Sequence, residues 1–594
     1  MASIDGVIIW KRPAAWWNVP QQANAQGEKI SAALKLTPLL GRVLANRGFD
    51  VAEAERFLSP SLDGLHDAYL MKDMDRAVSR LWQAVQAREP VLLYGDYDVD
   101  GTSSVVVLKK AIEILGGCAS FHIPHRLKDG YGMRSEVIDH AAREGVRLIV
   151  SVDTGIRASE VVRHAQAIGI DVIVTDHHLP EQELPPALAV LNPNRLDCDY
   201  PNKNLCGAGV TLKLVQALLK RSGMAEARQA ALVDSFLKPV AIATVADIVP
   251  LTGENRVIVQ RGLSGMRHVK NPGLRALMTV AGLDEGEPPS AHQVAFRLAP
   301  RINAAGRMAT AKDVIELFLT NDSNRAREIA ENLDVLNRER QTVEAEIVET
   351  VLKQCEERAG MADQAAFVFA GEDWHLGVLG IVASRLVERL CRPVFVLSNS
   401  SSMDPSLGPH LSGSGRSIAG FHLLAALEAM PELFAKFGGH KQAAGVTLAV
   451  SQLAAFQQRF HEHAAGVVTA DDMRPVFAVD ANASFADFTD DGVAQLQLMG
   501  PFGFGNTNPI LHVQSAEVAG PAKVLTEGKH FSVPLRHEGR LLFCKAWSFG
   551  ERAELFEPGR KLDLLVQLED DAYSRKRGYS PWCVTLKDAR AASH

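Results

Sequence analysis

Between residues 90 and 180 the chain alternates between short, wholly apolar runs and longer segments with helical periodicity. The apolar runs have the length of strands and lack a polar face, which is typical of parallel strands covered on both sides. The segments between them have about 10–15 residues, enough for a helix that returns the chain to the same edge of a sheet. The pattern predicts an α/β domain with a parallel sheet, whose strands are VLLYG (91–95), ASFHI (119–123), RLIVSVD (147–153) and DVIVTD (171–176).

The patterning changes again on both sides of this region. Residues 29–58 have helical periodicity. Residues 321–359 contain neither proline nor glycine and repeat apolar positions at helical spacing, which predicts one long helix connecting two domains. A second α/β pattern follows with AAFVFA (365–370) and RPVFVL (392–397). From about residue 475, short alternating runs separated by turns predict an antiparallel β-barrel.

A chain of 594 residues is too long for one hydrophobic core, so several domains are expected. We expect an N-terminal helical segment at 1–75, a catalytic α/β domain at 76–320 and a connecting helix at 321–360. We further expect a smaller α/β domain at 361–470 and the β-barrel at 471–594.

Composition and charge narrow the class of protein. The N-terminus lacks a basic stretch leading into an apolar region, and no apolar run approaches the ~20 residues of a membrane helix, so we expect a cytoplasmic protein. Seven cysteines without C-x-x-C spacing predict reduced thiols and argue against zinc ribbons. The net charge of −7 excludes a protein that coats nucleic acid through bulk charge. Any polyanion must therefore meet a local basic cleft.

Acidic residues and histidines follow several of the predicted strands. In an open parallel sheet, ligands bind where the carboxyl ends of the strands emerge. One acidic residue at such an end is commonly a helix cap, but a whole set with two adjacent histidines is difficult to assign to capping. The set comprises Asp96, Asp98 and Asp100 after the first strand, Asp153 after RLIVSV, and Asp176, His177 and His178 after DVIVT, with Asp247 as a further contributor.

Carboxylates combined with imidazoles are the ligand set of hard or borderline divalent metals. Oxygen-rich sites suit Mg²⁺ and Mn²⁺, and the lack of thiolate argues against structural zinc. Because alternation within DYDVD points two carboxylates the same way, we favour two ions about 3.5–4 Å apart, as in phosphatases and nucleases. For any single aspartate a loop carboxylate is the better interpretation, whereas for the set we expect a metal site.

Two further regions suggest nucleic-acid contacts. SGSGRS (412–417) combines small residues with an arginine, which suits backbone N–H groups turned towards a phosphate, although such a segment is often only a loop. In the predicted barrel, aromatic residues lie close to basic ones, as in a single-strand stacking groove, although aromatics in a barrel are as often core. These aromatics are Phe531, Phe543, Trp547, Tyr573, Tyr579 and Trp582.

The motifs together resemble a known family. GDYDVDG, SVDTG, TDHH, LCGAG (205–209) and ATVADIVPL (243–251) are similar to the DHH phosphoesterase superfamily. Tyr94 is a departure, since some members of that superfamily have a metal-binding histidine at its position, four residues before Asp98. The likeness extends to the RecJ single-strand-specific exonucleases through HRLKDGYG (125–132), RINAAGR (301–307), WHLGVLGIVASRL (374–386), SGRS (414–417), FGGHKQAAG (437–445) and PFGFGNTNP (501–509).

The resemblance implies a DHH domain joined by the long helix to a DHH-associated domain, followed by an OB-like barrel. It implies a 5′→3′ exonuclease that releases mononucleotides from single-stranded DNA with two Mg²⁺ or Mn²⁺ ions, in DNA repair and recombination. Single-strand-binding protein and a RecQ-type helicase are the partners expected from the family.

The resemblance also assigns roles to individual residues. The metal ligands are Asp98, Asp100, Asp153, His177 and Asp247, with Asp96 and His178 as ligands or their partners. Asp176 orients a histidine, and His375 and His440 approach the scissile phosphate or the strand beside it. The pocket for a terminal 5′-phosphate comprises Arg126, Arg307, Ser414 and Arg416.

Two other classes of protein are also compatible with the sequence. A DHH enzyme acting on small substrates, such as a pyrophosphatase or a dinucleotide phosphodiesterase, would not need the region beyond residue 475. A non-catalytic scaffold built on a decayed DHH core is opposed by the intact aspartates and histidines.

Overall fold

The computed structural model describes the chain except at residues 1, 2, 5, 6, 9–13, 21–23, 127, 128, 131, 284, 358–363, 400–408, 527, 528, 593 and 594. It divides into two compact units. The first contains Leu62–Met473, and the second combines Pro13–Ser61 with Arg474–His594. Each unit is described separately below.

A five-stranded parallel sheet forms the centre of the first unit, in the order β5-β4-β6-β7-β8. This confirms the parallel sheet predicted from the apolar runs. The sequence reasoning did not identify the short edge strand β8. The strands are β4 (Pro90–Gly95), β5 (Cys118–His122), β6 (Leu148–Val152), β7 (Asp171–Thr175) and β8 (Ala189–Leu191).

Both faces of this sheet are buried, which explains why its strands lack polar positions. Val91 and Leu93 lie in the core that contains α4 (Met74–Ala87), α5 (Val99–Ile114) and α8 (Gly207–Arg221). Leu92 and Tyr94, at the alternate positions of the same strand, lie in the core on the opposite face. That core is completed by α6 (Ser135–Arg143) and α7 (Ser159–Ala167).

Helices also make up the rest of this first domain. Among the described residues, only α9 is both long and apolar enough to cross a membrane, and half of that stretch is buried in the protein, where α9 packs on α5, α8 and α10. The helices are α9 (Glu226–Ala246), α10 (Gly253–Gly265), α11 (Pro272–Val280), α12 (Ala291–Gln293), a π-helical turn at Val294–Leu298, α13 (Ala299–Met308) and α14 (Lys312–Leu319).

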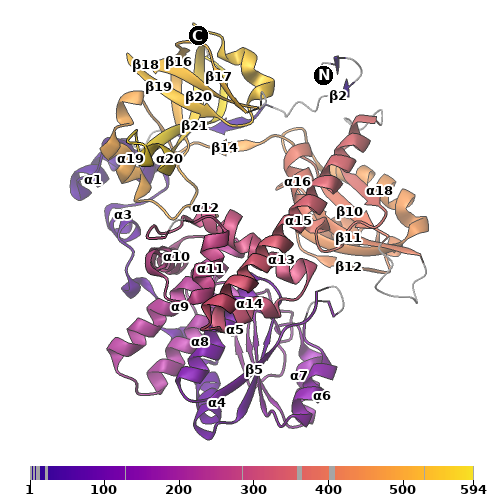
Figure 1. Cartoon of the computed structure of the whole chain (residues 1–594). Coiled ribbons are helices and arrows are strands. Elements are labelled where there is room, and N and C mark those ends of the chain that lie inside the picture. The colour runs from indigo at the N-terminus through magenta and orange to yellow at the C-terminus, as the bar shows by residue number, and fades with distance from the viewer. Residues whose placement is uncertain are drawn as a thin grey trace. The chain divides into compact units, whose positions relative to one another are not determined.

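The predicted connecting helix is present as α15 (Ser323–Glu357), a single helix of 35 residues. Figure 1 shows it running from α14 to the second sheet of this unit. Its first half packs on α11, α13 and α14, and it also contacts α16 (Leu379–Leu390) of the next domain. The helix is therefore packed along the first domain and reaches the second.

The second domain of this unit has a five-stranded sheet in the order β12-β13-β11-β10-β9. Only β9 and β10 are parallel, and the other pairs are antiparallel. The sheet packs against α16, α17 (Leu423–Glu428) and α18 (Leu453–Val467). Its strands are β9 (Phe367–Gly371), β10 (Val394–Ser398), β11 (His410–Arg416), β12 (Lys436–Gly439) and β13 (Ala443–Ala449).

The segment expected to be a phosphate-binding loop is instead mostly strand. Most of SGSGRS lies in β11, where Ser414 is opposite Val396 on one side and Gly445 on the other. The backbone N–H groups of this central strand therefore belong to the sheet ladder, and the expectation of a loop was wrong. Small residues serve packing here, because a Cβ on Gly415 would lie 2.4 Å from the ring of Phe395.

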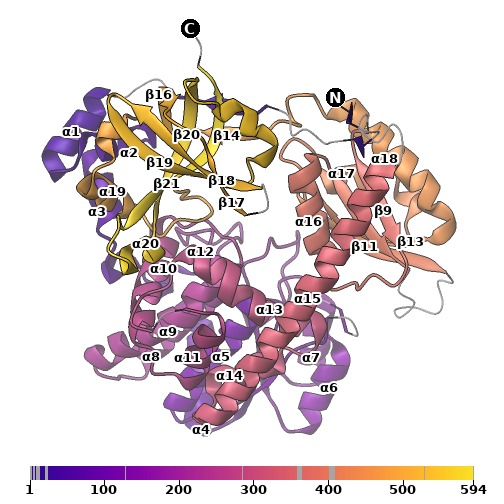
Figure 2. The ribbon, with the colours of Figure 1, turned by 45° about the horizontal axis from the view of Figure 1, so that its top comes forward.

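The second unit contains the OB-like barrel expected from the resemblance. The barrel closes through the order β16-β20-β21-β19-β18 and back to β16, and the strands are visible in Figure 2. Two further short strands, β15 (Ala481–Asn482) and β17 (Lys523–Thr526), extend it. The barrel strands are β16 (Leu511–Val518), β18 (His530–His537), β19 (Arg540–Ala546), β20 (Lys561–Asp570) and β21 (Trp582–Ala591).

The N-terminal helices pack with this barrel in one hydrophobic core. They are α1 (Asn24–Leu34), α2 (Pro38–Asn46) and α3 (Val51–Leu58). Leu39 and Leu44 of α2 are buried in the same cluster as barrel residues such as Val533. Arg47 adds polar contacts, since its guanidinium donates to the carboxylate of Asp480 at 2.7 Å. Sequence reasoning did not predict this association.

The barrel aromatics divide between core and surface. Phe531 is buried, whereas Phe543, Trp547 and Tyr579 are exposed. Trp582 is half-buried and donates its indole N–H to Asp490 at 2.7 Å. The side chain of Tyr573 lies outside the described residues. Three of the six aromatics are therefore available at the surface, together with Leu541 on the same strand as Phe543.

Candidate metal centre and arginine cluster

The carboxyl ends of β4, β6 and β7 bring the predicted acidic residues and histidines together. All eight lie at or just after these strands or at the C-terminal end of α9, where Asp247 is the C-cap. Seven of them form three overlapping groups in which one ligand atom per residue lies within 4.8 Å of the others. The groups are Asp153 with His177 and His178, Asp100 with His177 and Asp247, and Asp96 with Asp98 and Asp153.

Backbone N–H groups hold two of these carboxylates in place. Asp98 is the N-cap of α5, and its carboxylate accepts from the N–H groups of Asp100 and Gly101 at 2.9 and 3.0 Å. Asp100 accepts from the N–H groups of Gly207 and Ala208, at 2.6 and 2.8 Å, at the beginning of α8. A helix N-terminus stabilises a negative charge, which offsets part of the repulsion between these aspartates.

Asp153 adopts a backbone conformation that is unusual for a residue with a side chain. Its φ is 59°, in the left-handed region that costs energy outside glycine and occurs mainly where structure or function requires it. The neighbouring position must be glycine, because a Cβ on Gly207 would lie 2.6 Å from both Cβ and Oδ1 of Asp153. The close approach of α8 thus fixes both Asp100 and Asp153.

Several ligand atoms at the centre of the cluster are buried without a hydrogen-bond partner. They are Asp96 Oδ1, Asp153 Oδ1 and His177 Nε2. His177 Nε2 lies 3.3 Å from Asp153 Oδ1, 3.8 Å from Asp100 Oδ2 and 3.7 Å from Asp247 Oδ2. Buried polar atoms are normally satisfied, so orphan atoms that converge in this way fit a divalent cation.

The electrostatics of the cluster also favour the binding of a cation. Burial and the charge of Asp98 raise the pKa of Asp96 well above its usual range. Burial, followed by Asp100 and Asp98, does the same to the pKa of Asp153. Burial, Asp100 and Asp98 raise the pKa of Asp247 to about 9. The raised pKa values favour the protonated, neutral carboxyls where no positive charge is near, and a bound metal ion would displace these protons.

Asp176 is placed differently from the other carboxylates. Its Oδ1 accepts from Nδ1 of His178 at 2.7 Å, and its Oδ2 accepts from the N–H of Ile156 at 3.0 Å. Burial opposes ionisation, but the hydrogen bond and charge of His178 outweigh it and lower the pKa of Asp176. Conversely, Asp176 raises the pKa of His178 despite burial. The pair fixes the orientation of the His178 ring, which belongs to one of the three ligand groups.

His177 lacks such a carboxylate partner on its other nitrogen among the described residues, and burial lowers its pKa. The neutral imidazole is the form that binds metal. Tyr94, at the position where some family members have a histidine, is wholly buried and donates its hydroxyl to the carbonyl of Gly132 at 3.3 Å. Burial raises the pKa of this hydroxyl to about 12, so Tyr94 serves the core rather than the cluster.

Three predicted phosphate-binding arginines lie within electrostatic reach of one another. Burial, followed by Arg126 and Arg340, lowers the pKa of Arg307 to about 9. Burial and Arg126 likewise lower the pKa of Arg416. Arg126 itself stacks on the ring of Tyr97, 4.9 Å from the ring centre. Arg307 donates to the carbonyl of Gly377 at 2.9 Å, and Arg416 to that of Gly415 at 2.8 Å.

The three residues Arg126, Arg307 and Arg416 are called the arginine cluster below. Within the described chain, none of the three forms an ion pair with an acidic side chain. All three are half-buried. Positive charges withdrawn from water without counter-ions are costly unless a ligand supplies the negative charge. The negative charge of Asp98 is close enough to Arg307 to raise its pKa in part. The arginine cluster therefore lies beside the acidic cluster.

The remaining predicted residues border the same region. Ser414 is on β11, two residues before Arg416. His375 lies near Arg307, since Nδ1 of His375 accepts from the N–H of Gly377, whose carbonyl Arg307 binds. His440 is exposed, and partial desolvation, followed by the charges of Arg157 and His178, lowers its pKa. The proximity of His178 links His440 to the acidic cluster.

Sequence reasoning missed Arg340. It lies on α15, is buried, and adds to the positive charge around Arg307. Its guanidinium donates to Glu344 at 2.9 Å and to Asn337 at 3.0 Å. The sequence contains an indication that Arg340 is buried, because it lies seven residues after Leu333 and so on the same apolar face of the helix.

Three family models match successive parts of the chain. They are the DHH family N-terminal domain at residues 90–244, the DHHA1 domain at 363–466 and the RecJ OB domain at 479–580. The fold and the acidic cluster at the edge of its parallel sheet agree with these matches. The protein is thus a DHH-family protein with a DHHA1 domain and an OB domain.

Sequence and structural relatives show which family of DHH proteins the chain belongs to. The chain is 35% identical to the single-stranded-DNA-specific exonuclease RecJ of Bacillus subtilis over 94% of this chain and 69% of that protein. The crystal structure of Thermus thermophilus RecJ with Mn²⁺ superimposes with a TM-score of 0.82 and 29% identity, over 98% of this chain and 80% of that one. The same protein with Mg²⁺ gives 0.77 and 28%, over 98% and 79%. The chain belongs to the RecJ family, which confirms the resemblance found in the sequence.

Proposed function

We propose that the protein hydrolyses single-stranded DNA from its 5′ end and releases 5′-mononucleotides with the help of two divalent metal ions. Membership of the RecJ family supports a single-strand-specific exonuclease. The observation that carries the finer proposal is that the arginine cluster, which forms no ion pair with an acidic side chain among the described residues, lies beside an acidic cluster with buried, unpaired ligand atoms. Metal ions would compensate the acidic cluster, and the phosphate at a strand end would compensate the arginine cluster.

The acidic cluster suits two ions rather than one. Asp153 and His177 each belong to two of the three ligand groups, so both are placed to serve neighbouring positions. Mg²⁺ or Mn²⁺, the ions in the two Thermus thermophilus structures, would neutralise phosphate charge and activate a water molecule there. His375 and His440, whose pKa values are lowered by burial, would hydrogen-bond the strand as neutral imidazoles.

The arginine cluster supports the 5′ polarity. A terminal phosphate carries more negative charge than an internal one, and guanidinium groups grip phosphate oxygens bidentately. Arg126, Arg307 and Arg416, with Ser414, would hold that phosphate one nucleotide away from the cut. Breaking the P–O3′ bond releases a 5′-mononucleotide and leaves a new 5′-phosphate on the shortened strand. The new end then enters the same site.

The experiment is a time course on one single strand labelled either at its 5′ or its 3′ end, with EDTA, Mg²⁺ or Mn²⁺. We expect no product in EDTA, and with metal we expect the 5′ label to appear at once in a mononucleotide while the 3′ label shortens step by step. Retention of the 5′ label on progressively shorter strands would contradict the polarity. A dinucleotide degraded as fast as a long strand would instead favour a small-substrate phosphodiesterase.

We further propose a cytoplasmic role in DNA repair and recombination, with single-strand-binding protein and a RecQ-type helicase as partners. The support is family membership alone. Titration of each purified partner into the exonuclease assay tests it, because a functional partner changes the rate on long strands or on a duplex being unwound.

A further inference from the structure

We propose that Ile248 and Phe296 form a subsite for a nucleobase next to the scissile phosphate. This inference rests on the proposed function and deepens it. Both side chains line a cavity of about 230 Å³ in the first unit, and Arg307 and Arg340 line it as well. The cavity therefore combines an apolar wall with two cations close to the candidate metal centre.

The two apolar residues are exposed to an extent that packing does not explain. The side chains of Ile248 and Phe296 are each 68% exposed, although the cavity wall around them is formed by small apolar residues. The ring of Phe296 also stands against that of His292, with the ring centres 4.5 Å apart and the planes inclined by 32°. Exposed rings beside a cationic groove are the usual platform for bases of a single strand.

The backbone at both positions is irregular. Ile248 has a φ of 57°, which is strained for a β-branched residue, and it follows Asp247 of the candidate metal centre directly. Phe296 lies in the π-helical turn Val294–Leu298, and such turns occur frequently at functional sites. Strain of this kind persists where the surrounding structure serves a function.

The charge on the cavity favours a phosphate-bearing ligand over a neutral one. Glu344 binds Arg340 at 2.9 Å and also pairs with Arg385, so two arginines share one carboxylate. Arg307 has no acidic partner within the described residues. The cavity thus has an excess of positive charge next to an apolar wall, which matches a nucleotide with its base on the wall and its phosphate at the arginines.

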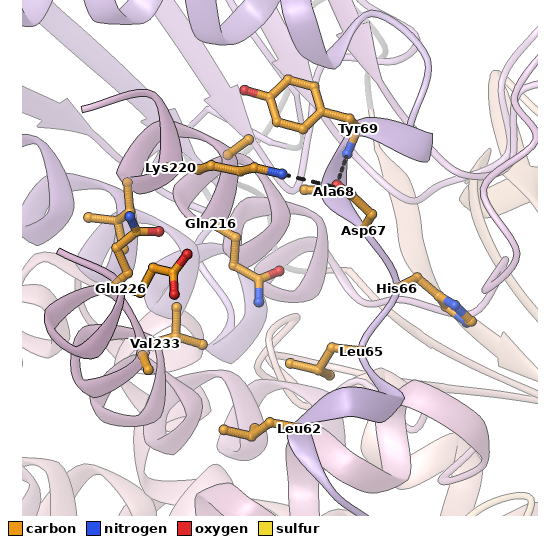
Figure 3. A pocket seen from close by; sticks show the side chains of 14 residues that line it. Leu62, Leu65, His66, Asp67, Ala68, Tyr69, Gln216, Lys220, Glu226 and Val233 are labelled. Atoms are coloured by element: carbon orange, nitrogen blue, oxygen red, sulfur yellow. Dashed lines mark hydrogen bonds and ion pairs between the residues drawn. The ribbon is translucent and has the colours of Figure 1, made fainter. Parts of the chain in front are cut away.

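A larger cavity of about 360 Å³ lacks this combination (Figure 3). There Lys220 lies 3.9 Å from the carboxylate of Asp67 and over the ring of Tyr69. None of the predicted site residues lines it. Its cation is already balanced by neighbouring groups, so the structure gives no reason to place a strand in it.

The test uses 5′-phosphorylated 12-mers in EDTA, in which binding is measured by fluorescence anisotropy without cleavage. One strand is unmodified, and four others carry a single abasic site at position 1, 2, 3 or 4. We expect Phe296→Ala to weaken binding of the unmodified strand roughly 5- to 100-fold, as for the loss of one stacked base. For one of the four abasic strands, the missing base is the one that would stack on Phe296. That strand should bind Phe296→Ala and the wild-type protein with equal affinity. Phe296→Tyr should restore affinity, and Leu196→Ala, which removes a fully exposed apolar side chain elsewhere, should change nothing.

Ile248→Gly separates function from folding. Glycine adopts a positive φ without strain, so the melting temperature should not fall, whereas affinity for the unmodified strand should. The shift in melting temperature on adding Mn²⁺ should persist, which shows that Asp247 is undisturbed.

Two results would overturn the subsite. In the first, both Phe296→Ala and Ile248→Gly bind every strand as tightly as the wild-type protein does. The exposed apolar wall would then be a contact surface for another protein rather than for a nucleobase. The other is a Phe296→Ala defect that is the same for all abasic positions. Either result with a wild-type enzyme that degrades strands from the 5′ end rejects the subsite alone, whereas an inactive wild-type enzyme rejects the proposed function.

Discussion

Replacing Asp247 with asparagine should make the metal-free protein less sensitive to rising pH, although it removes a candidate metal ligand. The carboxyl of Asp247 is held among like charges, and burial together with Asp100 and Asp98 raises its pKa to about 9. In the unfolded chain the same group would titrate at its ordinary value of 3.8. Between these values the folded protein keeps a proton that the unfolded chain has lost.

The sign and size of the effect follow from this difference. A raised pKa in the folded state means that the contribution of the group to stability is complete below about pH 4 and is lost as pH rises towards 9. Each pH unit in that window costs about 1.4 kcal/mol of the free energy of unfolding. From pH 6 to pH 8 the loss is about 2.7 kcal/mol. This is an upper limit, because the side chain of Asp247 is 26% exposed. Asparagine does not titrate and avoids the loss.

The assay is thermal unfolding of wild type and Asp247→Asn in EDTA at pH 6, 7 and 8. The transition to follow is the one that Mn²⁺ shifts in the wild-type protein. Since 1 kcal/mol corresponds to about 2–4 °C for a domain of this size, the wild-type melting temperature should fall by about 5–10 °C more than that of the variant. Asp234→Asn is the matched control, because Asp234 is an exposed partner of Arg261 and such pairs contribute little.

Parallel curves for wild type and Asp247→Asn would refute the reasoning, since they would show that Asp247 does not hold a proton in the folded state. Addition of Mn²⁺ gives an independent check. The ion must displace protons from the cluster, so it should stabilise the wild-type protein more at pH 8 than at pH 6, and Asp247→Asn should lose the part of this difference that comes from the Asp247 proton.

Three further predictions concern other parts of the site. Gly207→Ala places a Cβ 2.6 Å from Oδ1 of Asp153, so we expect a 10- to 100-fold loss of turnover and a smaller Mn²⁺-induced shift in melting temperature; normal values of both would contradict it. Arg416→Ala should reduce the preference for 5′-phosphorylated over 5′-hydroxyl strands, measured as kcat/KM, by about 1.5–3 kcal/mol, whereas equal losses on both strands would indicate a merely structural role. Phe543→Ala should weaken binding of long strands by about 1–3 kcal/mol without lowering the melting temperature. Phe531→Ala, in the barrel core, should show the reverse, and identical behaviour of the two variants would refute the surface assignment.

The fold was predictable where one periodicity determines one structure. The wholly apolar runs from Val91 to Thr175 became parallel strands because both faces of their sheet are buried. The apolar stripe at helical spacing, uninterrupted by proline or glycine, likewise permits only one structure, and it forms α15. SGSGRS was misinterpreted because small residues suit either a loop or a strand that neighbouring side chains approach closely. The pairing of α1–α3 with the barrel was not predictable, since an apolar helix face does not specify what covers it.

The acidic cluster could be predicted for a geometric reason. Parallel strands end at the same edge, so residues that follow Tyr94, Val152 and Thr175 come together whatever lies between them. No comparable rule brings Arg126, Arg307 and Arg416 together, because they come from a loop, a helix and a strand of two domains. Only the family resemblance grouped them.

The two clusters nevertheless follow one physical principle, and this links their functions. An acidic cluster without a cation and an arginine cluster without an anion each destabilise the folded protein. The two clusters do not neutralise each other. The charge of Asp98 raises the pKa of Arg307, but burial and the charges of Arg126 and Arg340 lower it more. Charges kept apart in this way retain their attraction for outside ligands. A strand end that enters with metal ions satisfies both clusters, because its terminal phosphate meets the arginines and its scissile phosphate meets the metals. The affinities for metal and for a strand end should therefore reinforce each other, and by linkage each should strengthen the other by the same factor.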